Sequence, residues 1–140
     1  MKIFEGKIEY LFNRCNERYF GECLPRPSFK VIHKKNVFAR FECNIGWNKG
    51  ISNPVIMVTD RYDFTEEQQI NLIMHEMIHY LLAFRKMHKG NFNHGKAFKE
   101  MMDEFNRKEG LNIQITYDPN EFEEIKGDGI LKKAVKWLLD

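Results

Sequence analysis

The chain has 140 residues, a mass of 16.8 kDa and a formal net charge of +2, with 43% hydrophobic and 30% charged residues. These values fit one globular domain, exclude a disordered or fibrous chain, and give no sign of a nucleic-acid binder on charge alone. No apolar run approaches the ~18 residues of a membrane span, and the charged residues among positions 2–9 are unlike a signal peptide. We therefore expect a single cytoplasmic domain over residues 1–140, without membrane partners.

The first element in the chain is a helix, because apolar residues recur at steps of three and four from Phe4 to Tyr19. Gly21, Pro25 and Pro27 end it. Three cysteines lie in or after this region, and their odd number and lack of CxxC spacing argue against a disulfide framework and a zinc ribbon. We expect them reduced: Cys15, Cys23 and Cys43.

Strand-like segments follow this helix. Residues 29–31 and 37–43 alternate between apolar and polar side chains, and 34–36 is a candidate hairpin turn between them. Residues 44–53 are expected to be a loop that holds Trp47 between two glycines. Pro54 then opens a third strand over residues 55–58.

Two helices carry the strongest patterns. Thr65 and Gln68 have the spacing of a capping box, and an apolar stripe follows as far as Leu82. The second helix has its apolar face over residues 97–105 and ends at Gly110. The remaining elements are a strand candidate at 112–117, an acidic loop at 119–127, and a last helix capped by Asp128. Together these elements predict an α+β fold with a small sheet of three or four strands packed on helices.

An HExxH motif, His75-Glu76-Met77-Ile78-His79, lies inside the best-defined helix. At ~100° per residue the two histidines are ~40° apart on the helix surface, so both imidazoles can reach one ion. Glu76 lies ~60° beyond His79, beside that ion rather than aimed at it. The apolar stripe lies on the other side of the helix, which predicts that the histidines face a cleft.

A catalytic zinc site needs a third protein ligand and an open position for water. The candidates downstream are His88, His94 and a carboxylate, Glu100 or Glu104. His94 is the best placed, because it immediately precedes the second helix, which can run antiparallel to the first. His33 is interpreted as structural or exposed.

One zinc ion per chain would then support amide hydrolysis. Zinc held by neutral imidazoles lowers the pKa of a bound water toward ~7, and Glu76 would take the proton of that water and return it to the leaving amine. The developing oxyanion needs a further donor. Tyr80, Tyr117 and Arg85 are the candidates, and the sequence does not choose among them.

Several segments together resemble the SprT-like family of zinc metallopeptidases. Residues 12–20 with Leu24-Pro25-Arg26-Pro27 are similar to the opening helix and its exit, 39–41 to the next strand, 75–81 to the active-site helix, and His94-Gly95 with Phe98 to the third-ligand motif. The resemblance covers residues 11–117 and leaves 118–140 as a C-terminal extension with a helix.

The resemblance implies a zincin-like fold with His75, His79 and His94 on zinc and Glu76 catalytic. It also implies an endopeptidase acting on a protein or peptide substrate; eukaryotic relatives cleave proteins crosslinked to DNA. Many members carry a four-cysteine zinc ribbon after the protease domain, whereas no cysteine follows Cys43 here.

Basic residues raise a second hypothesis, a DNA-binding module with a structural zinc or a dormant peptidase site. Five cations and no acidic residue lie between positions 85 and 99, and a second basic group surrounds Trp137. A zinc hydrolase acting on non-peptide amides is a third reading. The candidate nucleic-acid contacts are Lys86, Lys89, Lys96 and Lys99.

Overall fold

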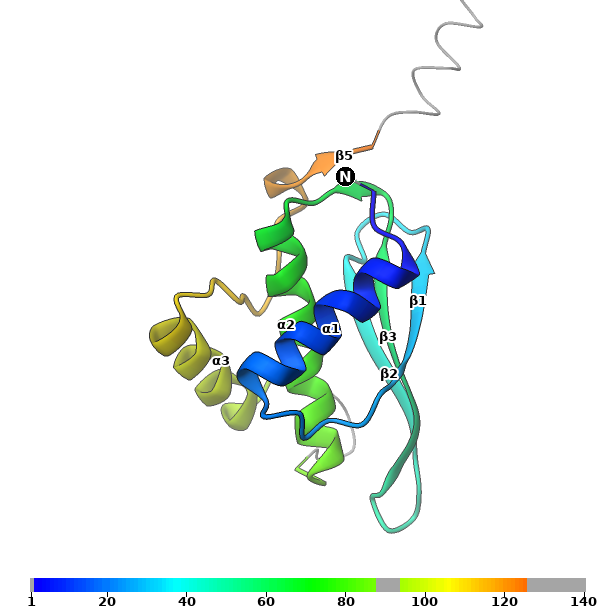
Figure 1. Ribbon diagram of the computed structural model, residues 1–140, viewed down its shortest axis with the longest axis vertical. Helices are drawn as coiled ribbons and strands as arrows, with labels where there is room; N and C mark the ends of the chain where they lie inside the picture. The colour runs from blue at the N-terminus through cyan, green and yellow to red at the C-terminus, as the bar shows by residue number, and fades with distance from the viewer. Residues whose placement is uncertain (1, 88–93, 126–140) are drawn as a thin grey trace, which may run out of the picture.

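Helix α2 (Glu66–Phe84) is the central element of the computed structural model, which describes residues 2–87 and 94–125. Helix α1 (Glu5–Tyr19) crosses it, α3 (Lys96–Glu109) runs beside it, and a sheet covers a further side (Figure 1). The fold is therefore α+β, as predicted. Within the described residues no helix has both the length and the apolar character to cross a membrane.

The sheet has three strands, β1 (Ser28–Ile32), β2 (Ala39–Ile45) and β3 (Ile51–Thr59), in the order β1-β3-β2. β1 pairs with β3 in parallel, and β2 pairs with β3 antiparallel. The predicted hairpin through residues 34–36 is therefore wrong, because β3 lies between β1 and β2. The actual hairpin joins β2 to β3 through a short turn, and its strands extend into the predicted loop 44–53. Trp47, in that turn, is 98% exposed.

A second, two-stranded sheet pairs β4 (Tyr62–Asp63) with β5 (Glu123–Glu124), and a single 3-10 turn, η1 (Pro119–Glu121), precedes β5. The segment predicted as a strand at 112–117 is irregular instead. The last predicted helix, with Lys132, Lys133, Lys136 and Trp137, lies outside the described residues.

The capping box at the start of α2 is present. Thr65 Oγ1 accepts a hydrogen bond from the backbone N–H of Gln68 at 3.1 Å, and Gln68 Oε1 accepts one from the Thr65 N–H at 2.9 Å. These two bonds fix where α2 begins and therefore which side of the helix each following residue faces. At the far end of α3, Gly110 adopts the left-handed conformation (φ 66°) that a helix C-terminus favours.

Burial of α2 extends to every side of the helix, so the side that was predicted to face a cleft is covered as well. All residues from Asn71 to Ala83 are buried, the two histidines included. On the sheet side the Tyr80 ring stacks between Phe12 and Phe41, at centroid distances of 6.5 and 5.2 Å. The histidine side is covered by α3 and by the segment that follows it.

Candidate metal centre

Three histidines, two from α2 and one from just before α3, meet beside the middle of α2. His75 and His79 lie one turn apart on α2, and His94 immediately precedes Gly95, the N-cap of α3. The Nε2 atom of His94 is 3.0 Å from Nε2 of His75 and 3.3 Å from Nε2 of His79. All three candidate ligand atoms lie within 4.8 Å of one another, so the three imidazoles can bind one metal ion.

The spacing of these nitrogens fits zinc. Zn–N bonds of 2.0–2.1 Å in tetrahedral geometry place neighbouring ligand nitrogens ~3.3 Å apart, close to the two separations observed. Three neutral imidazoles are also a ligand set that zinc uses in catalytic sites, where the fourth position stays open for water or substrate.

Burial keeps two of these imidazoles neutral. It lowers the pKa of His75 to about 4 and of His79 to about 3, and the neighbouring histidines reinforce the effect at both. It also lowers the pKa of His94. Because a protonated imidazole cannot bind a metal, a lowered pKa favours the form that can.

The orientation of His75 is set by a hydrogen bond from its other ring nitrogen. Its Nδ1 lies 2.7 Å from the carbonyl oxygen of Gln114. A carbonyl oxygen only accepts hydrogen bonds, so Nδ1 carries the proton and Nε2 presents its lone pair to the other histidines. Partners of this kind fix the tautomer and the ring orientation of metal-binding histidines.

Phe98 of α3 forms an apolar support behind the three imidazoles. Its ring centroid lies 4.8 Å from that of His75, 4.6 Å from that of His79 and 4.9 Å from that of His94. The side chain is buried and lies on the first turn of the helix that His94 precedes. Phe98 therefore couples the packing of α3 on α2 to the position of all three rings.

The carboxyl group of Glu76 lies next to the histidines without joining them. Its Oε2 is 3.8 Å from His75 Nε2, and it accepts a hydrogen bond from the backbone of Phe41 in β2. Burial raises the pKa of Glu76 to about 8, opposed by this hydrogen bond and by the charge of Arg40. A bound divalent cation would favour the charged carboxylate. The proton affinity of this buried acid would therefore change if the three histidines bound a metal ion.

The three candidates for oxyanion stabilisation differ in their surroundings. Tyr80 donates its hydroxyl proton to the Pro25 carbonyl at 2.8 Å and packs in the core. Arg85 is exposed just after α2. The Tyr117 ring lies 6.1 Å from the His75 ring, but its hydroxyl donates to the Asn71 carbonyl at 3.3 Å.

Alternative third ligands are placed away from the histidines where the structure describes them. Glu100 pairs with Lys96 at 3.8 Å and Glu104 with Lys108 at 2.5 Å, all on the exposed face of α3. His33 contacts Asp60 at 2.8 Å. His88 and Lys89 lie outside the described residues.

The remaining candidate DNA contacts, Lys86, Lys96 and Lys99, are exposed around the end of α2 and the start of α3.

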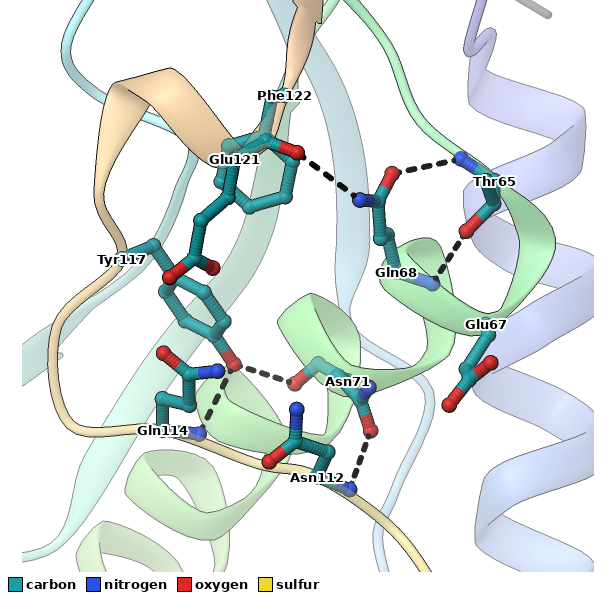
Figure 2. A pocket seen from close by; sticks show the side chains of 9 residues that line it. All are labelled: Thr65, Glu67, Gln68, Asn71, Asn112, Gln114, Tyr117, Glu121 and Phe122. Atoms are coloured by element: carbon teal, nitrogen blue, oxygen red, sulfur yellow. Dashed lines mark hydrogen bonds between the residues drawn. The ribbon is translucent and has the colours of Figure 1, made fainter.

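A small polar pocket adjoins the metal centre (Figure 2). Its walls come from the first turns of α2 and from the segment 112–122, and its volume is about 230 Å³. Ligand pockets usually measure ~300–1,000 Å³, so this hollow is small for a separate ligand site. It is joined to the metal centre by Gln114, which lines the pocket and also accepts the hydrogen bond from His75.

Some of these contacts could not be found by sequence reasoning. Every residue has a main-chain carbonyl, so the residue type at position 114 does not show that its carbonyl accepts a hydrogen bond from His75. The only available signal was asparagine inside a helix, at Asn71 and Asn106, where this residue type is not favoured. Both asparagines prove to bind the segment that carries Gln114.

Two histidines one turn apart on a buried helix, with a third from just before the next helix, form a ligand set of the kind that catalytic zinc sites use. The family model of the SprT-like family matches residues 8–117. Because that match covers most of the chain, the protein belongs to the SprT-like family, whose domains are of the zincin-like metallopeptidase type. A search of curated proteins finds no match.

Proposed function

We propose that this protein is a zinc-dependent endopeptidase with His75, His79 and His94 as metal ligands and Glu76 as general base. The observation that carries the proposal is the convergence of three Nε2 atoms beside a buried carboxyl group. Membership of the SprT-like family supports the same class of reaction.

Zinc, when bound, supplies a Lewis acid that makes water acidic near neutral pH and polarises a substrate carbonyl. Glu76 then takes one proton from the attacking water, and the water oxygen forms a bond to the carbonyl carbon. The same carboxyl group delivers the proton to the amide nitrogen as the C–N bond breaks. The products are a carboxylic acid and an amine, so the atoms of one water are consumed.

The surroundings of Glu76 suit this proton transfer. Burial favours the protonated carboxyl group, whereas a cation beside it favours the carboxylate, so the pKa of Glu76 is drawn toward neutrality from both sides. The Phe41 N–H holds the carboxyl group in place. Glu76 can therefore accept and release one proton without leaving its position.

The sheet beside Glu76 favours a peptide over a small amide as substrate. Among the described strands β2 pairs only with β3, so its other side is an edge. The edge strand passes directly beside the catalytic carboxyl group, because Phe41 of β2 contacts Glu76. Exposed strand edges bind extended peptides through main-chain hydrogen bonds, which would bring a peptide carbonyl to the metal.

The test compares zinc-loaded parent protein with its Glu76→Gln variant on an unstructured protein substrate, followed by gel electrophoresis. The variant should bind zinc as the parent does and lose at least ~100-fold in cleavage rate, the usual scale for a general base. Glu104→Gln, an exposed glutamate paired with Lys108, is the control and should cleave normally. Equal cleavage by Glu76→Gln and the parent would contradict the mechanism.

A further inference from the structure

The segment from Asn112 to Gln114 runs along α2 and is bound to it at two places. The Asn112 N–H donates to Asn71 Oδ1 at 3.2 Å, and the Gln114 carbonyl accepts from His75 Nδ1 at 2.7 Å. Figure 2 shows Asn71 next to Asn112 with this hydrogen bond between them. One helix face thus provides an acceptor at Asn71 and a donor at His75.

The spacing of the two contacts is matched. Four residues of helix advance ~6.0 Å, a distance that the three residues from Asn112 to Gln114 can span without being fully extended. Asn71 and His75 are four residues apart on the helix, whereas Asn112 and Gln114 are two apart on the segment. With the hydrogen bonds that Asn106 makes to Ile113, these contacts tie three consecutive residues of the segment to α2 and α3.

Asn106 of α3 holds the residue between these two contacts. Its Nδ2 donates to the Ile113 carbonyl at 2.9 Å, and its Oδ1 accepts from the Ile113 N–H at 2.8 Å. The Ile113 side chain is buried, with 2% exposed. Both polar main-chain groups of Ile113 are thus bound by one side chain, which fixes the rotation of the adjoining peptide units.

Tyr117 completes the arrangement. Its hydroxyl accepts from the Gln114 N–H at 3.2 Å and donates to the Asn71 carbonyl at 3.3 Å (Figure 2). The peptide groups on both sides of Gln114 are therefore held by side chains of α2 and α3 and by Tyr117.

We propose that Asn71, Asn106 and Tyr117 are positioning residues for the metal centre: they hold the Gln114 carbonyl against His75 and so fix the His75 imidazole with Nε2 toward the metal. The inference rests on the metal ligands of the proposed function and not on peptide cleavage. Residues that orient metal-binding histidines typically change metal affinity 10–100-fold when they are replaced.

The first test is the zinc affinity of Asn106→Ala, measured by competition with a chelator of known affinity. We expect zinc binding weaker by about 10–100-fold. The matched control is Asn16→Ala. Asn16 holds Leu24 by the same pair of bonds, at 2.9 and 3.2 Å, in the turn after α1. It should lose comparable stability to urea and keep the zinc affinity of the parent.

The second test measures the tautomer of the His75 imidazole. In the metal-free parent, ¹⁵N NMR of His75 should show the tautomer protonated at Nδ1, and Asn106→Ala should show a mixture of tautomers. If Asn106→Ala does not fold, Tyr117→Phe replaces it in both tests, because it removes one hydroxyl and keeps the ring. It should also weaken zinc binding and give a mixture of His75 tautomers.

Unchanged zinc affinity in every folded variant would overturn the proposal, as would an equal loss in Asn16→Ala. Neither readout involves cleavage. A protein that binds zinc as described and cleaves nothing would contradict the proposed function and leave this inference standing.

Discussion

The Nε2 atoms of His75 and His94 lie 3.0 Å apart, although nineteen positions separate the two residues in the chain. Their proximity depends on the docking of α3 against α2, because His94 immediately precedes α3 and His75 lies in the middle of α2. The three-histidine cluster therefore depends on the packing between the two helices, in which Phe98 is the buried residue of α3.

Replacing Phe98 should weaken both the fold and the metal site. Phe98→Ala removes a ring that is 1% exposed and contacts all three imidazoles. We expect a loss of ~3–5 kcal/mol in the free energy of unfolding, measured by urea denaturation, together with weaker zinc binding.

The control for this prediction is Phe64→Ala, another buried phenylalanine, which packs against Tyr62 and Phe122 instead. It should cost similar stability in the metal-free protein and leave zinc affinity unchanged. If the two variants bind zinc equally well, Phe98 does not support the histidines.

Acid should destabilise the metal-free protein from about pH 6.5 downward. The pKa values of His75 and His79 are lowered from 6.5 to about 4 and about 3 by burial. Below pH 6.5 the unfolded chain protonates both residues and the folded chain does not. The unfolded state therefore binds more protons, and the free energy of unfolding falls as the pH falls toward 4.

Glu76 has the opposite dependence, because its pKa is raised from 4.5 to about 8 in the folded protein. Its contribution to stability is present below pH 4.5 and is lost as the pH rises to 8. Below pH 6.5 the loss of stability caused by the two histidines on acidification exceeds the gain from Glu76. Above pH 6.5 only Glu76 changes its protonation, and stability falls as the pH rises. The free energy of unfolding should therefore be greatest near pH 6.5. Urea unfolding with a chelator at pH 5.0, 6.5 and 8.0 checks this. Greater stability at pH 5.0 than at 6.5 would refute it.

The cysteines should differ widely in reactivity toward an alkylating reagent. Cys23 is exposed, whereas Cys15 is 3% exposed and burial raises its pKa to about 12. Because thiolates are the reactive form, Cys23 should be modified first in the folded protein and Cys15 only after unfolding. Timed alkylation with mass spectrometry measures the order. Equal rates for the two thiols in the folded protein would show that α1 is not packed as described.

Local patterns predicted the three described helices and the three histidines that the structure brings together. Thr65 and Gln68 sit three residues apart and identified the start of α2, and Gly110 identified the end of α3. Helix periodicity placed His75 and His79 on one side of α2. His94 required only the assumption that the next helix returns antiparallel, and the structure brings its Nε2 to theirs.

Long-range relationships were not predictable in the same way. The pairing of β1 with β3 joins residues far apart in the chain, and no local signal distinguishes it from a hairpin between β1 and β2. Residues 112–117 alternate as a strand would, but side chains of Asn71, Asn106 and His75 take the main-chain groups that a neighbouring strand would bind. Tertiary contacts therefore decide both cases.

Zinc content of the purified protein, beside that of His94→Ala, tests the central claim most directly. The three-histidine site predicts one zinc per chain in the parent and little or none in the variant after the same dialysis, with both proteins folded by circular dichroism. Undiminished zinc in His94→Ala would contradict the account, because the third ligand would then be a residue other than His94.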